Sequence, residues 1–127
     1  MQERISVQSH MHFNSYNAGI MAEFRARWYL RFRGFWILES RYITGKKTGR
    51  AEIDIIARRG NLLIFAEVKN RPTIIGAVES VGHSQAVRLR RAAADYMRQK
   101  HWTGAARFDV IAVCGKKIYW SHGALNK

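Results

Sequence analysis

The amino-acid sequence predicts a single mixed α/β domain, and three features of the chain carry this prediction. Two segments with apolar residues at helical spacing flank a block of apolar strands. Hydrophobic residues make up 47% of the 127 residues, which is enough for one compact core. The single proline and the absence of a long linker or low-complexity segment give no point of division. We therefore expect one domain in which helices flank a β-sheet.

Local patterns predict the order helix, three strands, helix, two strands. The first helix is expected from Tyr16 to about Arg33, with an apolar face formed by Ile20, Met21, Phe24, Trp28 and Phe32. Gly60-Asn61 is typical of a two-residue turn, so strands at 51–58 and 62–70 should form a hairpin. The other expected elements are a strand at 35–43, a basic loop at 44–49, an irregular segment at 72–80, a helix at 84–100 and strands at 107–114 and 117–120.

The ends of the chain differ from its centre. Residues 1–15 lack the apolar core of a secretory signal, so we expect an N-terminal extension, a domain at 16–121 and a tail at 122–127. No segment reaches the ~18 apolar residues that span a bilayer. Cys114 has no second cysteine to pair with, and its apolar neighbours predict a buried thiol. A cytoplasmic protein without a membrane partner is expected.

The charge is strongly unbalanced, with 22 Lys and Arg against 9 Asp and Glu and a net charge of +13. Basic charge spread along the chain is expected of a surface that binds phosphates, so we predict a nucleic-acid partner. The alternatives are a ribosome- or membrane-associated protein, or a basic surface without a particular partner.

The predicted hairpin brings acidic residues together. A turn at Gly60-Asn61 places Asp54 opposite Glu67 and Glu52 opposite Lys69. Because side chains alternate along a strand, these four residues share one face. The other face is wholly apolar and should cover the core; it pairs Ile53 with Val68, Ile55 with Ala66 and Ala57 with Ile64.

Two carboxylates that face each other across a hairpin repel, so the pair of Asp54 and Glu67 requires compensation. A divalent cation is one solution, since Mg²⁺ is typically held by one or two carboxylates together with water and substrate phosphate. Lys69 would then steady the attacking water or the charge that develops on the phosphate. The alternatives are a structural cluster in which Lys69 neutralises both acids, or a pair in which one carboxyl stays protonated.

At these residues the sequence resembles a known family. The runs Gly49-Arg50-Ala51-Glu52-Ile53-Asp54-Ile55-Ile56 and Leu63-Ile64-Phe65-Ala66-Glu67-Val68-Lys69-Asn70-Arg71 look like those of the YraN-like family of uncharacterised bacterial proteins. Ala22-Glu23 and Arg107-Phe108-Asp109-Val110 also match, and the likeness covers about residues 17–120. That family is grouped by resemblance with the PD-(D/E)XK, restriction-endonuclease-like superfamily, which includes restriction enzymes and Holliday-junction resolvases that cleave DNA with Mg²⁺. The resemblance therefore implies a restriction-endonuclease-like mixed β-sheet flanked by helices.

The same resemblance implies roles for individual residues. Asp54 and Glu67 would bind Mg²⁺, for which Mn²⁺ can substitute, Lys69 would be the catalytic lysine, and Glu23 on the first helix would complete the metal site. The alternative for Glu23 is a surface salt bridge with Arg27. The sequence departs from the pattern in having no proline before Asp54, and in having Gln85 where many relatives carry a lysine.

Several further residues are candidates for binding nucleic acid. They lie on the basic loop (Lys46 and Lys47), directly after the second hairpin strand (Arg71) or on the second helix (Gln85, Arg88 and Arg91). A solvated turn and a solvated helix face are the simpler interpretations of the same residues. The leading hypothesis is a Mg²⁺-dependent nuclease that hydrolyses phosphodiester bonds of DNA, including branched substrates. The alternatives are a non-catalytic nucleic-acid-binding module with the same fold, and a structural or partner-binding domain; a homodimer is left open.

Overall fold

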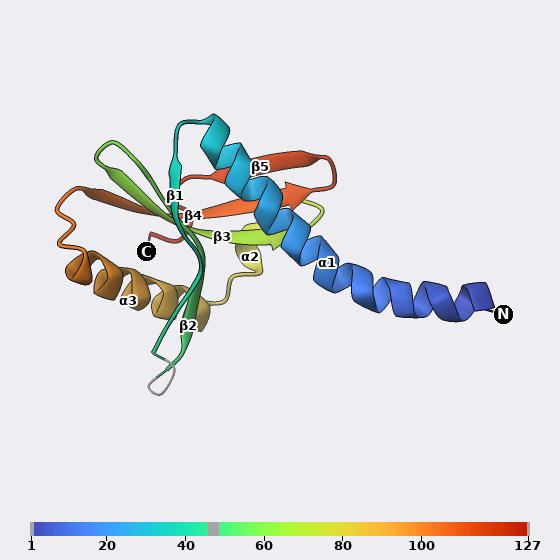
Figure 1. Cartoon of the computed structure of the whole chain (residues 1–127). Coiled ribbons are helices and arrows are strands. Elements are labelled where there is room, and N and C mark those ends of the chain that lie inside the picture. The colour runs from blue at the N-terminus through green and yellow to red at the C-terminus, as the bar shows by residue number, and fades with distance from the viewer. Residues whose placement is uncertain (1, 46–48, 127) are drawn as a thin grey trace.

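The chain forms a five-stranded sheet flanked by helices, which confirms the mixed α/β prediction (Figure 1). The computed structural model describes the backbone of residues 2–45 and 49–126, and the side chains of residues 16–45 and 49–126. The elements in chain order are α1 (Gln2–Phe32), β1 (Trp36–Thr44), β2 (Ala51–Arg59), β3 (Leu62–Asn70), α2 (Ile74–Glu79), α3 (His83–Gln99), β4 (Ala105–Cys114) and β5 (Lys117–Ser121).

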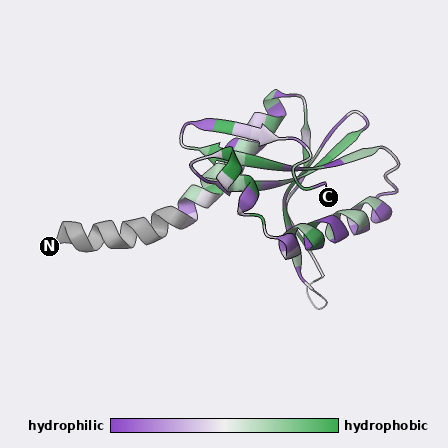
Figure 2. Cartoon of the chain, turned by 180° about the vertical axis from the view of Figure 1, so that it is seen from behind, coloured by the Kyte–Doolittle hydropathy of each residue, from purple (hydrophilic) through white to green (hydrophobic). Residues whose placement is uncertain are grey.

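The strands lie in the order β1-β2-β3-β4-β5. Only β3 and β4 are parallel among the described strands, and the crossover between them contains α2 and α3. Figure 2 shows hydrophobic residues along the central strands and an alternation of polar and apolar residues on α3. This alternation is expected of a helix that covers a sheet with one side and meets water with the other.

A hydrophobic core lies on each face of the sheet. On the α1 side, Ala26 and Leu30 pack on apolar residues of the sheet, namely Phe35, Ile55, Ala57, Ile64, Ala66 and Ile111. On the α3 side, Leu89, Ala92, Ala93 and Tyr96 pack on residues that include Ile53, Ile56, Leu63, Phe65, Val110 and Ala112. The sheet is therefore the middle of three layers, and the predicted core pairs Ile55–Ala66 and Ala57–Ile64 are confirmed.

The hairpin has the predicted turn and register, but its ladder is shorter than predicted. Gly60 has φ +57°, as the first residue of a type II′ turn requires. Pairing then runs from Arg59–Leu62 to Ile55–Ala66 and ends there. Beyond this point β2 continues to pair only with β1, and β3 only with β4. The predicted pair of Glu52 with Lys69 is therefore wrong, because the strands separate before they reach it.

This separation, which we call the fork, also corrects the predicted faces. Ile53 packs in the core under α3, whereas Val68 borders the core under α1. The two residues do not form the apolar pair that simple alternation predicts, because β2 follows β1 beyond the fork. The fork lies directly before Asp54 on β2 and Glu67 on β3.

Two predictions for the helices are wrong. Helix α1 begins at Gln2 and not near Tyr16. Residues 2–18 contain no proline or glycine that would interrupt a helix. The segment after Pro72 is not irregular but contains α2, whose Thr73 accepts a hydrogen bond from the backbone N–H of Gly76 at 3.0 Å. The side chains of residues 1–15 lie outside the described residues, so the N-terminal extension stays a prediction.

The predicted apolar face of α1 is also wrong. Ile20, Met21, Phe24, Trp28 and Phe32 are exposed, and the helix packs on the sheet through Ala22, Ala26 and Leu30. Small side chains let the helix approach the sheet closely, so the smaller apolar residues and not the larger ones face the core.

The C-terminal part of the chain is held by a buried carboxylate. Asp109 on β4 is fully buried and accepts two hydrogen bonds from Arg107, one from the Trp120 indole and one from the backbone N–H of Gly123. Four donors on one carboxylate satisfy its charge and tie β5 and the following residues to β4. Leu125, in the predicted tail, is also buried.

Two further predictions concern the burial of Cys114 and the lack of a membrane-spanning segment. Cys114 is a free thiol, but it is half-buried and packs at the edge of the core under α3. None of the helices in the described parts of the chain combines the length and the apolar character that crossing a membrane requires.

Candidate active site

Asp54 occupies the fork between β2 and β3. Its Oδ2 accepts a hydrogen bond from the backbone N–H of Val68 at 2.8 Å. A side chain of β2 thus bonds to β3 where the backbone ladder between the two strands has ended. The contact fixes the orientation of the Asp54 carboxylate.

Glu67 is the most deeply buried acid of the site, with only 2% of its surface exposed. Its Oε2 accepts a hydrogen bond at 3.1 Å from the amide of Gln85, in the first turn of α3. Its Oε1 is buried and accepts no hydrogen bond of ordinary geometry from a described residue, although the backbone N–H of Asp54 is near enough to the carboxylate to lower its pKa. Because buried polar atoms are nearly always satisfied in folded proteins, this oxygen is in the state expected of a ligand-binding group.

The two carboxyl groups are electrostatically coupled. Burial, together with the charge of Asp54, raises the pKa of Glu67 to about 8, and Lys69 opposes this shift. Burial also raises the pKa of Asp54 to about 6, against the hydrogen bond from Val68, and the charges of Glu23 and Glu52 add to it. Since the groups share one environment, the pair carries about one negative charge near neutral pH.

Lys69 and Glu23 lie close enough to influence this pair. The charge of Lys69 lowers the pKa values of both Asp54 and Glu67, while that of Glu23 raises the pKa of Asp54. Glu23 forms an ion pair with Arg41 on β1, at 2.9 Å, and not with Arg27, the partner considered as the alternative to a metal-binding role. Arg27 is one turn away on the same helix, whereas Arg41 comes from the neighbouring strand.

The residues present fit a divalent cation held by two carboxylates. No group of three or more His, Cys, Asp or Glu side chains in the described ranges, 16–45 and 49–126, is arranged to hold a metal ion. Mg²⁺ does not need such a group, because water and substrate phosphate complete its shell. The unsatisfied Oε1 of Glu67, beside the coupled carboxyl of Asp54, is the feature of this structure that supports the fit.

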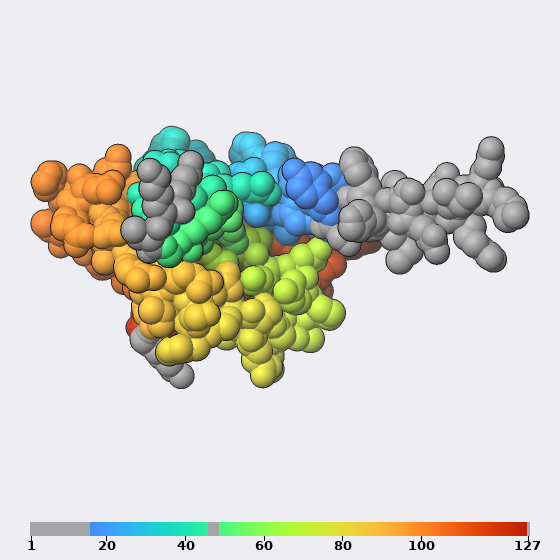
Figure 3. All heavy atoms as spheres, turned by 90° about the horizontal axis from the view of Figure 1, so that it is seen from below, coloured from blue at the N-terminus to red at the C-terminus, as the bar shows by residue number. Residues whose placement is uncertain are grey.

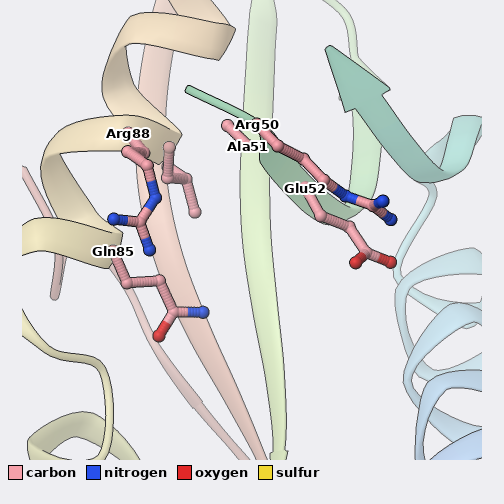
Figure 4. Close-up of a pocket in the computed structure, with 6 residues that line it drawn as sticks. Arg50, Ala51, Glu52, Gln85 and Arg88 are labelled. Carbon is pink, nitrogen blue, oxygen red and sulfur yellow. The ribbon is translucent and has the colours of Figure 1, made fainter. Parts of the chain in front are cut away.

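A pocket of about 220 Å³ lies between the start of β2 and α3, and neither Asp54 nor Glu67 lines it. Figure 4 shows Gln85 and Arg88 on the α3 side, whereas the side chains of Glu52 on β2 and of Arg50, directly before β2, extend away from α3. Gln85 both lines the pocket and bonds to Glu67. The Arg88 guanidinium suits a phosphate group bound on the α3 side of the pocket.

The predicted nucleic-acid-binding residues lie in several places. Arg88 and Arg91 line a second pocket, of about 270 Å³, together with Gly49, and Arg71 is exposed at the end of β3. Figure 3 shows the start of α3, in yellow and orange, beside the green spheres of β2 on one face. Lys46 and Lys47 lie outside the described residues.

Two polar residues of the pocket were not among the predicted site residues. Arg50 directly before β2 and Glu52 on it are two positions apart, so alternation along an extended chain would have placed them on one face. The contact between Gln85 and Glu67 had no such signal, because 18 positions separate the residues and only the tertiary fold joins them.

Comparison with known proteins identifies similar chains. A model of the "Uncharacterised protein family UPF0102" matches residues 22–113, a range that includes every predicted site residue. A UPF0102 protein of Bartonella tribocorum is 45% identical over 101 residues, which are 78% of this chain and 75% of that protein. A UPF0102 protein of Paramagnetospirillum magneticum is 36% identical, with 83% of each chain covered. One of Shewanella halifaxensis is 39% identical, covering 85% of this chain and 94% of the relative.

Proposed function

This chain belongs to the uncharacterised protein family UPF0102, and we propose that it is a Mg²⁺-dependent nuclease that hydrolyses phosphodiester bonds of DNA. The observation that carries the proposal is the buried Glu67 with its unsatisfied Oε1, next to Asp54 at the fork. A buried carboxyl without a partner is costly to fold, and a role in binding a cation accounts for it. The resemblance to the restriction-endonuclease-like superfamily also supports a metal-dependent nuclease.

In this proposal the carboxylates of Asp54 and Glu67 would hold the ion. The bound cation supplies a Lewis acid that polarises the phosphate and lowers the pKa of water. The Lys69 ammonium donates a hydrogen bond to the phosphate and stabilises the negative charge that develops on it. Hydrolysis joins the oxygen of water to phosphorus and breaks one P–O ester bond, and the leaving oxygen departs with a proton.

The remaining residues of the site position the substrate. The hydrogen bond from Gln85 to Oε2 fixes the orientation of the Glu67 carboxylate, which would hold the ion. Arg88, which lines the pocket that Gln85 also lines, binds the next phosphate along the strand. The net charge of +13 increases the local concentration of polyanions around the site.

The test is cleavage of duplex, single-stranded and branched DNA in the presence of Mg²⁺ or Mn²⁺. We expect cleavage of at least one substrate, which Asp54→Asn and Glu67→Gln abolish. Lys69→Met should lower the rate by about 100-fold or more, as expected for a group that stabilises transition-state charge. Glu79→Gln is the matched control, because Glu79 is an exposed acid on α2.

Other outcomes separate the alternatives. Salt-sensitive DNA binding that persists in Glu67→Gln, without cleavage of any substrate, would refute the nuclease and leave a non-catalytic binding module. Failure to bind any nucleic acid at low salt would refute both functions.

A further inference from the structure

The side of α1 that faces away from the sheet is apolar. Tyr16, Ile20, Met21, Phe24, Trp28 and Phe32 form this outer stripe, and Trp28 and Phe32 have 51% and 82% of their surface exposed. The rings form a continuous ridge, with centroid distances of 6.5 Å from Phe24 to Trp28 and 5.8 Å from Trp28 to Phe32.

The opposite side of the same helix is apolar as well, because Ala22, Ala26 and Leu30 are buried on the sheet. A helix that is apolar on both sides is expected to be buried on both sides. The sheet covers one side, and no described residue of the chain covers the outer stripe.

The size of the outer stripe is close to that of a protein interface. At about 200 Å² for a whole large side chain, the exposed fractions of its six members amount to roughly 700 Å². The largest apolar patch of a typical monomer is about 300–600 Å², whereas a stable interface takes about 800 Å² from each partner. Trp36, which is 65% exposed at the start of β1, extends the patch toward that value.

Two of the arginines beside the outer stripe, Arg25 and Arg31, are turned toward their own chain. Arg25 donates a hydrogen bond to the carbonyl of Gly115. Arg31 donates to the carbonyl of Phe35, at 3.0 Å, and its guanidinium stacks on Trp36 at 3.9 Å. A groove for single-stranded nucleic acid needs free cations that follow the phosphates between the stacked bases. Arg27 makes no hydrogen bond or ion pair with a described residue, but one free cation does not follow a chain of phosphates, so the geometry favours a protein partner.

We infer that the outer stripe of α1 packs against the same stripe of a second copy, in a two-fold symmetric dimer. An apolar ridge is complementary to another apolar ridge, and each copy carries one. Two-fold dimers, in which one patch meets itself, are the commonest assemblies of soluble proteins. The inference is independent of the nuclease proposal, because the outer stripe faces away from the sheet that carries the two acids.

The mass of the protein in solution tests this inference. In sedimentation equilibrium the full chain should form dimers with a dissociation constant in the micromolar range or below. Trp28→Glu and Phe32→Glu should each raise that constant at least about 30-fold, as expected for the centre of an interface. Circular dichroism will show that each variant is folded, since both side chains are largely exposed. Ile75→Glu is the control, because Ile75 is 69% exposed on α2, outside the stripe.

The salt dependence of the dimer and the binding of ligands distinguish a second copy from nucleic acid or lipid as the partner of the outer stripe. Raising NaCl from about 0.1 M to about 0.5 M should preserve or tighten the dimer, because it screens repulsion between two copies of charge +13. An assembly that dissociates over this range would overturn the inference, since bridging nucleic acid behaves in this way. It would also be overturned by a chain that stays monomeric at about 100 μM, whether or not it binds oligonucleotides or phosphatidylcholine vesicles, or by a dimer that both stripe variants retain.

Discussion

Replacing Glu67 with glutamine should make the metal-free protein more stable above neutral pH, although Glu67 lies at the centre of the candidate active site. The unfolded chain ionises this carboxyl near its ordinary pKa of 4.5, whereas burial and the charge of Asp54 raise the pKa to about 8 in the folded protein. Folding at neutral pH must therefore either take up a proton or bury a charge. Glutamine removes both costs.

The sign and the magnitude follow from this shift. Because the folded pKa lies above the unfolded one, the contribution to stability is fully present below about pH 4 and is lost as the pH rises through about 8. One pKa unit corresponds to about 1.4 kcal/mol, so the cost at neutral pH reaches roughly 3 kcal/mol. Glutamine keeps a buried polar group in place, so we expect a gain of roughly 1–3 kcal/mol, or about 4 °C in Tm per kcal/mol.

The assay is urea unfolding at about pH 5 and about pH 8, in the presence of EDTA, for the wild type, Glu67→Gln and the exposed control Glu79→Gln. The advantage of Glu67→Gln over the control should be larger at the higher pH. Millimolar Mg²⁺ should then stabilise the wild type at that pH and leave Glu67→Gln unchanged, since binding to the folded state alone raises stability. A Glu67→Gln variant that is no more stable than the control at the higher pH would refute this reasoning.

Three further predictions concern the site and its support. Gln85→Lys should stabilise the metal-free protein at about pH 8 more than at about pH 5, because an ammonium beside Glu67 favours its ionised form; equal urea midpoint shifts at both pH values would contradict this. Asp109→Asn should lower the free energy of unfolding by about 3 kcal/mol, because the buried charge of Asp109 meets four hydrogen-bond donors; a loss well below 1 kcal/mol in urea would show that asparagine satisfies them. The double variant Arg88→Ala, Arg91→Ala should reduce the slope of log affinity against log salt by about two in fluorescence anisotropy with duplex DNA, and an unchanged slope would place both residues away from phosphate.

The hairpin could be predicted from the sequence because its determinants are local. Gly60 and Asn61 define the turn, and the turn defines the register as far as Ile55 and Ala66. The fork could not be predicted in this way. Whether β2 stays with β3 beyond that pair depends on competition from β1 and β4, which the turn does not encode. The sequence thus correctly identified Asp54 and Glu67 as neighbours, but it did not indicate that they lie where β2 and β3 separate.

The orientation of α1 was beyond prediction for a different reason. Helical spacing is satisfied both by the stripe that contains Phe24 and Trp28 and by the one that contains Ala22, Ala26 and Leu30. Periodicity alone cannot select between two apolar faces of one helix. The choice depends on how closely the helix approaches the sheet, which is a property of the assembled layers.

The fork has a consequence for the order in which the protein opens. Beyond Asp54, β2 has a single hydrogen-bonded neighbour, β1, whereas β3 remains paired with β4 as far as Asn70. Local opening is easiest where the fewest partners must be lost, so backbone amides from Ala51 to Ile53 should exchange with deuterium before those of β3. Glu52, which lines the pocket, belongs to this part of β2. The side of the pocket formed by β2 should therefore open more readily than the α3 side, and under the proposed function this is the side by which a nucleic-acid strand would enter.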